Sequence, residues 1–187
     1  MLTENELIKF RRELHSYPET GWCEFVTTHK IVEKLRSFGL DPIYGRQVIN
    51  PEFVAGRNPA KVEEAKKAAL EKGVPPEFIE SMQDYTGVAA IFETGRPGPV
   101  LAIRFDMDCV DVDEAHEAGH RPFDEGWAST NPGHMHSCGH DGHATMGIAV
   151  CNWIQENLDQ FCGTIKVVFQ PAEEGVRGAR PMTETGI

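Results

Sequence analysis

An eight-residue run at 136–143, with the sequence HSCGHDGH, constrains this chain more than any other segment. It holds one thiol, three imidazoles and one carboxylate, and its glycines allow the backbone to turn tightly between them. Thiolate, imidazole and carboxylate groups are the protein ligands that zinc and similar divalent ions prefer. Cys138 and His140 lie two residues apart, so an extended or looped backbone directs both side chains to the same side. The run therefore predicts a divalent-metal site that includes Cys138 and His140.

A pair of adjacent acids, Glu173 and Glu174, provides a second signal further along the chain. The pair follows the apolar run 163–169, which is typical of a strand. Two adjacent carboxylates repel each other in a low-dielectric site unless a cation lies beside them. One glutamate can then bind the metal while its neighbour acts as general base on metal-bound water. On this pair alone, an exposed acidic turn after a strand is the slightly favoured interpretation.

Two aspartates, Asp106 and Asp108, follow a second predicted strand at 100–105. Residues two apart in an extended chain point to the same side, so both carboxylates face one direction. A carboxylate at this position can orient an imidazole that binds metal, although aspartate is also common at helix starts and turns. His143 follows the Cys138 and His140 pair and can bind substrate, orient a ligand or cap a helix. The five other histidines are expected to be surface or packing residues.

Hydrophobic patterns of period 3.6 and period 2 alternate along the chain. A capping box at Thr3–Glu6 opens a first helix that should end before Pro18. The alternation predicts an α/β fold, a mixed sheet flanked by helices, in which the first two long strands form a hairpin. Further helices are expected at 24–38, 58–72 and 143–158, and strands at 87–93, 100–105 and 163–169.

Two of these segments carry more detailed expectations. The segment at about 50–85 alternates acidic and basic residues and is expected to be a solvated surface insertion. The helix at 143–158 is expected to bury an apolar stripe made of Met146, Ala149, Val150, Trp153 and Ile154.

Composition narrows the classes of function. The formal net charge of −11 argues against a nucleic-acid partner, which would need basic patches. No apolar run approaches the roughly 20 residues that span a bilayer, so no membrane partner is expected. The acidic N-terminus has no signal-peptide pattern, which favours the cytoplasm. The five cysteines are odd in number and irregularly spaced, so we expect reduced thiols rather than disulfides.

Four segments together resemble the M20 family of metallo-amidohydrolases, specifically its aminoacylase-like branch. They are RRELHSYPE at 11–19, RFDMD at 104–108, HSCGHDGH at 136–143 and QPAEEG at 170–175. They occur in the family's order and span nearly the whole chain. The resemblance implies a zinc-peptidase-like catalytic domain and an amide hydrolase that uses two divalent metal ions, zinc or manganese.

The resemblance also implies roles for individual residues. Cys138, His140 and Glu174 would bind metal. Glu173 would activate water as general base and then protonate the leaving amine, and Asp108 would orient a ligand histidine. The implied substrate is a small N-acyl amino acid, in this branch p-aminobenzoyl-glutamate, which is cleaved to p-aminobenzoate and glutamate.

Family members continue well beyond the position of Ile187. The resemblance therefore implies that residues 1–187 are the N-terminal part of a catalytic domain, with further histidine ligands and a lid domain downstream. We expect weak metal affinity and little or no turnover from the 187-residue chain alone. Homodimerisation, or pairing with a related subunit, would occur through the missing domain. Two alternatives stay open: a general aminoacylase or carboxypeptidase of the same family, and a non-catalytic metal-binding subunit. The presence of Glu173 beside Glu174 favours catalysis.

Overall fold

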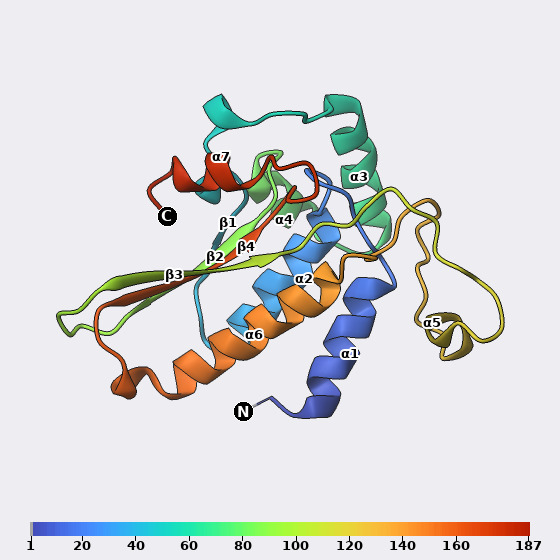
Figure 1. Cartoon of the computed structure of the whole chain (residues 1–187). Helices are drawn as coiled ribbons and strands as arrows, with labels where there is room; N and C mark the ends of the chain where they lie inside the picture. Colours follow the sequence, from blue (N-terminus) through green and yellow to red (C-terminus); the bar gives the residue numbers. More distant parts are fainter. Residues whose placement is uncertain (1) are drawn as a thin grey trace.

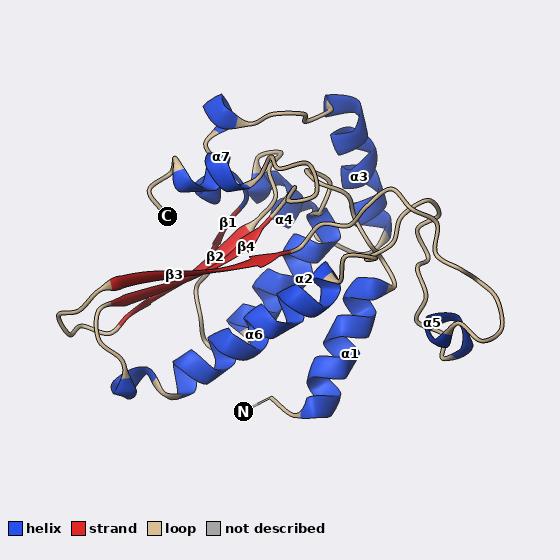
Figure 2. Cartoon of the chain, in the orientation of Figure 1, coloured by secondary structure: helices blue, strands red, loops and turns tan. Residues whose placement is uncertain are grey.

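A four-stranded mixed sheet with strand order β1–β2–β4–β3 organises the chain in the computed structural model, which describes residues 2–187 (Figure 1). Helices α2 and α6 cover one face of this sheet, α1 packs on α6, and α7 lies over the opposite face (Figure 2). The expected α/β fold with a mixed sheet flanked by helices is confirmed. The strands are β1 (Ile43–Tyr44), β2 (Val88–Glu93), β3 (Val100–Asp106) and β4 (Thr164–Gln170). The helices are α1 (Glu4–His15), α2 (Phe25–Arg36), α3 (Pro59–Glu71), α4 (Pro76–Met82), α5 (Arg121–Asp124), α6 (His140–Glu156) and α7 (Ala179–Thr183).

The predicted hairpin between the strands at 87–93 and 100–105, which are β2 and β3, is wrong. Strand β4 lies between β2 and β3, antiparallel to β2 and parallel to β3. The loop 94–99 bridges over the start of β4, where the backbone N–H of Gly163 donates to Arg96 O and that of Thr164 donates to Pro99 O. The central position suits β4, because Ile165, Val167 and Phe169 are all buried in the main core.

The N-terminal helix begins as the sequence predicts. The Thr3 side chain accepts from the backbone N–H of Glu6, and the Glu6 carboxylate accepts from the backbone N–H of Thr3, so the capping box is present. Helix α3 likewise begins at Pro59, with the Asn58 side chain as its cap. Local sequence signals therefore determine where these helices start.

Helix α6 buries a different face from the expected one. Met146 and Trp153 are 55% and 47% exposed, whereas Ala144, Ile148 and Cys151 are buried. A Cβ atom added at Gly147 would lie 2.6 Å from the Phe169 ring, so small residues let this helix approach the sheet closely. Of the predicted stripe, only Ile154 is fully buried, because the bulky rings of the sheet require a small-residue face on the helix.

The segment at about 50–85 contributes to the core as well as to the surface. Its charged residues lie mainly on the outer face, but Val62 and Ala69 of α3 are buried. Phe78, Ile79 and Met82 of α4 belong to the same buried cluster as the sheet and α2. The segment is therefore solvated on one side and packed on the other. No helix within residues 2–187 has the length and hydropathy to cross a membrane.

Candidate metal centre

The candidate site lies where β3 and β4 end and α6 begins. Strand β3 ends at Asp106, β4 ends at Gln170, and α6 starts at His140 after Gly139, whose φ of +84° lies in the left-handed region. Because β3 and β4 are parallel, the residues that follow them leave the sheet at the same edge. Sites in α/β proteins commonly form at this edge, outside the carboxyl ends of the strands.

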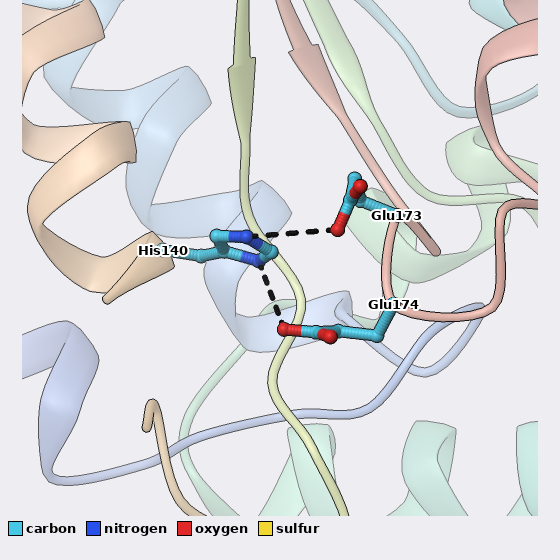
Figure 3. Close-up of side chains that lie close together, drawn as sticks. All are labelled: His140, Glu173 and Glu174. Carbon is cyan, nitrogen blue, oxygen red and sulfur yellow. Dashed lines mark ion pairs between the residues drawn. The ribbon is translucent and has the colours of Figure 1, made fainter. Parts of the chain in front are cut away.

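Three of the predicted site residues converge there (Figure 3). The His140 ring lies between two carboxylates, with Nε2 3.8 Å from a Glu173 oxygen and Nδ1 3.8 Å from Glu174 Oε1. One ligand atom from each of the three residues lies within 4.8 Å of the others. Residues from the start of a helix and the end of a strand therefore form a compact group of metal-binding side chains.

The predicted thiol lies beside this group rather than within it. Cys138 is exposed, and it does not belong to the compact group of His140, Glu173 and Glu174. A hydrogen bond to the Glu174 carboxylate is the main reason that the pKa of Cys138 is raised to about 11. A raised pKa of this kind favours the protonated thiol at neutral pH.

Asp108 connects the two sides of the site. Its backbone oxygen lies 2.9 Å from His140 Nδ1, and its Oδ2 accepts the backbone N–H of Glu174 at 3.1 Å. Burial lowers the pKa of His140, but the hydrogen bonds to Asp108 outweigh burial and raise that pKa to about 9. The fully buried Asp108 therefore orients the imidazole and also contacts the turn that carries the glutamates.

The donor set fits a divalent cation. The buried oxygens Asp108 Oδ1 and Glu174 Oε1 have no hydrogen-bond partner in the structure of residues 2–187. Buried carboxylate oxygens are normally paired, and a cation beside them would satisfy both. Imidazole, carboxylate and thiol groups together are typical of sites for zinc and related ions.

Asp106 and His143 form a neighbouring pair. His143 Nδ1 lies 3.2 Å from Asp106 Oδ2 and accepts the Asp106 backbone N–H at 3.0 Å. The ring also meets Phe105 edge-on, with 5.1 Å between centroids. Asp106 additionally pairs with Arg104 at 3.2 Å. Both strand-end aspartates therefore face the first turn of α6, Asp108 toward His140 and Asp106 toward His143.

His15, which was expected to be a surface or packing residue, is buried, and its ring also forms hydrogen bonds. It is buried between two carboxylates, with Nδ1 2.9 Å from Asp141 and Nε2 3.0 Å from Glu114. Burial lowers its pKa, but these two hydrogen bonds outweigh burial and raise it. Nothing in the sequence pairs His15 with Asp141, which is 126 residues away.

Two further buried polar residues were not singled out from the sequence. His136 is buried, and neither of its ring nitrogens is hydrogen-bonded to any residue of the described range 2–187. Burial lowers its pKa to about 4. Glu24 is fully buried, and burial, together with the charge of Asp108, raises its pKa to about 8. Its position next to the aromatic residue Phe25 at a helix start offered no sequence signal for such burial.

Comparisons with known proteins find similar sequences. Residues 102–187 match Peptidase family M20/M25/M40. Over 98% of its length the chain is 47% identical to a Haemophilus influenzae protein named as a homologue of one of the subunits of p-aminobenzoyl-glutamate hydrolase. Over 97% of its length it is 42% identical to an "Indole-3-acetyl-aspartic acid hydrolase" of Enterobacter agglomerans. The chain spans only 44% and 42% of the lengths of these relatives.

Solved structures of similar proteins share the fold. An aminobenzoyl-glutamate utilization protein of Klebsiella pneumoniae superposes with a TM-score of 0.77 at 32% identity, over 97% of this chain and 40% of the other. A dinuclear metal-binding peptidase of the M20 family from Bacillus subtilis superposes with a TM-score of 0.70 at 29% identity, over 97% and 39% of the two chains. Residues 102–187 of this chain therefore carry a domain of peptidase family M20/M25/M40.

Proposed function

We propose that this chain supplies the metal-binding and general-base residues of an amide hydrolase that acts on N-acyl amino acids, with p-aminobenzoyl-glutamate as its substrate. The observation that carries the proposal is the convergence of His140, Glu173 and Glu174 where two parallel strands end. A buried aspartate, Asp108, contacts both sides of this group. This constellation is the minimum that metal-assisted hydrolysis requires: ligands, a group that orients them and a neighbouring free carboxylate.

The proposed roles follow from the contacts. Cys138, His140 and Glu174 would hold the divalent ions, two in the complete site, with zinc favoured by the thiolate and manganese accepted by oxygen-rich positions. Bound metal would polarise the amide carbonyl and lower the pKa of water. Glu173 would accept the water proton and pass it to the leaving amine, since its partly exposed carboxylate lies 3.8 Å from His140. Asp108 would keep the imidazole in its binding orientation.

The substrate proposal is supported by the names of the relatives. One relative is named for p-aminobenzoyl-glutamate and another for indole-3-acetyl-aspartic acid. Both compounds join an aromatic acid to an acidic amino acid through an amide bond. A general aminoacylase or carboxypeptidase with the same centre would instead accept neutral amino acids. Hydrolysis of a panel of N-acyl amino acids separates these two possibilities.

The proposal extends to the assembly. The Haemophilus influenzae relative is named as a homologue of one hydrolase subunit, which supports an enzyme of more than one polypeptide. Residues 1–187 would form part of its catalytic domain, with the metal centre and general base on this part. We further propose a cytoplasmic location, which the free cysteines support, because thiols stay reduced in that compartment.

A chimera tests the function directly. This chain replaces the matching segment of the Haemophilus influenzae relative, the protein is loaded with zinc or manganese, and release of p-aminobenzoate is followed. We expect the chimera to hydrolyse p-aminobenzoyl-glutamate. Glu173→Gln should keep its metal content and lose about 10²–10⁴-fold in kcat, as is typical when a general base is removed. The matched control is Glu93→Gln, an exposed glutamate at the other end of the sheet, which should retain full activity.

Two outcomes would contradict the assignment. If Glu173→Gln left kcat unchanged, the general base would have to be another group. If the chimera bound metal and hydrolysed no member of the substrate panel, the non-catalytic metal-binding subunit would become the better interpretation. Metal content is measured by elemental analysis in each case, so that loss of the ions is not mistaken for loss of the base.

A further inference from the structure

A buried glutamate far from the metal centre in sequence contacts the turn that carries the two site glutamates. Glu24 lies just before α2, and its side chain is 0% exposed. Its Oε1 accepts the backbone N–H of Ala172 at 2.8 Å, and its Oε2 accepts the Thr86 hydroxyl at 2.6 Å. Ala172 directly precedes Glu173 and Glu174, so one carboxylate ties the start of α2 to this turn.

The turn has an unfavourable backbone conformation at the contacted residue. Ala172 has a φ of +51°, in the left-handed region that residues with a Cβ rarely adopt. Its carbonyl oxygen accepts the backbone N–H groups of Arg177 and Gly178 at 3.1 and 3.2 Å. A residue held in this region needs surrounding contacts that keep it there. The hydrogen bond from Ala172 to Glu24 is one such contact.

Packing of the segment that precedes Glu24 supports the same conformation. A Cβ atom added at Gly21 would lie 2.8 Å from the Cα of Ala172, so the two backbones are in close contact. Trp22 is buried in the same apolar cluster as Ala172. Gly21 and Trp22 therefore pack against the turn, and Glu24 accepts the backbone N–H of Ala172 in the same turn.

We propose that Glu24 is a positioning residue that holds the left-handed turn at Ala172, so that Glu173 and Glu174 face His140. The chemical roles of those glutamates rest on the proposed function, but the positioning of the turn does not. In the part of the chain that the structure describes, no hydrogen bond or ion pair joins the Glu24 side chain to Cys138, His140 or Glu174. Its effect passes through the backbone of Ala172.

Substitution of Glu24 tests this role. Glu24→Ala leaves the Ala172 N–H and the Thr86 hydroxyl without their partner inside the protein, which favours a rearranged turn. We expect the affinity for zinc, measured by competition with a chromophoric chelator, to fall about 10–100-fold, as for other groups that orient ligands. Hydrogen exchange in the metal-free protein should accelerate in the peptide covering residues 170–178.

A conservative variant should restore both readouts. The Glu24→Gln side chain keeps one oxygen for the Ala172 N–H and offers an amide N–H to the Thr86 oxygen. We expect the zinc affinity of the Glu24→Gln variant, and its rate of hydrogen exchange at residues 170–178, to return close to the wild-type values. Thr86→Val, which removes only one of the two hydrogen bonds to Glu24, should give an intermediate loss. This variant also tests the proposal if Glu24→Ala does not fold.

The matched control separates positioning from a general loss of stability. Val32→Ala removes a buried side chain from the same helix, α2, in the main core rather than at the turn. It should lower the melting temperature and leave zinc affinity and exchange at 170–178 unchanged. The proposal is overturned if Val32→Ala lowers zinc affinity as much as Glu24→Ala, if Glu24→Gln fails to rescue, or if Glu24→Ala matches wild type in both readouts. Zinc affinities are measured in the chimera with the Haemophilus influenzae relative, which restores the downstream part of the site. Failure of the unsubstituted chimera to bind zinc would contradict the proposed function, whereas the comparison of hydrogen exchange in the 187-residue chain would still decide the role of Glu24.

Discussion

The two ends of strands β3 and β4 have opposite chemistry. At their carboxyl ends, polar and charged side chains are buried: Asp106, Asp108 and Gln170. At the starting end of β3, apolar side chains are open to solvent, with Val100 67% and Leu101 52% exposed. Soluble proteins usually bury apolar groups and expose charges, so both ends depart from the usual pattern.

The difference shows where function constrains the sheet. A buried carboxylate costs folding free energy unless hydrogen bonds or a cation compensate it. Buried carboxylates lie at the carboxyl end of the sheet, where backbone N–H groups donate to them. For example, the N–H of Glu174 donates to Asp108. The starting end has exposed hydrogen bonds from Arg96 to the backbone of Leu158 and Phe161. In the residues that the structure describes, however, β3 has no buried carboxylate before Asp106, and the exposed Val100 and Leu101 contribute little burial to stability.

The largest expected effect concerns the pH dependence of stability near the carboxyl end. Glu19 is buried beside the extension of β3, where its backbone oxygen accepts the N–H of Cys109. Burial raises the pKa of Glu19 from its ordinary value of 4.5 to about 7, although the hydrogen bonds from Val26 and Thr27 oppose this shift. The folded state thus binds more protons than the unfolded state between these two pH values. The stability that Glu19 contributes through its raised pKa is fully present below about pH 4.5 and is lost as the pH rises through about 7.

Glu19→Gln should remove this part of the pH dependence, because the amide does not titrate. The free energy of unfolding of the variant, relative to wild type, should increase between pH 5 and pH 8 by up to about 3 kcal/mol. Urea denaturation at several pH values measures the difference. The control is Glu93→Gln on the exposed part of β2, which should run parallel to wild type. If the free energy of unfolding had the same pH dependence in wild type and in Glu19→Gln, the pKa of Glu19 would not be raised by burial.

The next largest effect concerns metal binding at the same end. Asp108→Ala removes the carboxylate that contacts both His140 and the Glu174 backbone. We expect zinc affinity to fall about 10–100-fold. The melting temperature should also fall, because the substitution leaves the His140 imidazole and the Glu174 N–H without their buried partner. Competition with a chromophoric chelator gives the affinity. Asp159→Ala, an exposed aspartate after α6, is the control and should bind zinc as wild type does. Equal affinities for all three proteins would remove Asp108 from the site.

The elements and the two segments of the site could be predicted because their signals are local. The capping box at Thr3, the cap at Asn58 and the apolar run of β4 each act within a few residues. The dense run at 136–143 and the Glu173–Glu174 pair could likewise be recognised without a structure. Their convergence followed from the tendency of α/β sites to form at strand ends.

The remaining features depend on contacts between distant segments. Strand β4 separates β2 from β3 because the loop 94–99 bridges over its start, and no local pattern distinguishes this arrangement from a hairpin. The face that α6 buries is determined by the Phe105 and Phe169 rings against Gly147. The pairing of Glu24 with Ala172 spans 148 residues. In each case the partner lies in a part of the chain that a single-segment pattern cannot identify.

The smallest expected effect tests the starting end of the sheet. Leu101→Ser replaces a half-exposed side chain on edge strand β3, so the free energy of unfolding should change by less than about 0.5 kcal/mol, and zinc affinity should not change. The contrast is Phe105→Ala in the same strand, where the buried ring packs against Phe169 and its loss should cost about 3–5 kcal/mol. Urea denaturation of both variants gives the comparison. A loss above about 1.5 kcal/mol for Leu101→Ser would mean that this end contributes to folding despite its exposure, because surface substitutions without special contacts rarely cost so much. The two ends of β3 and β4 would then differ in polarity but not in how much they contribute to stability.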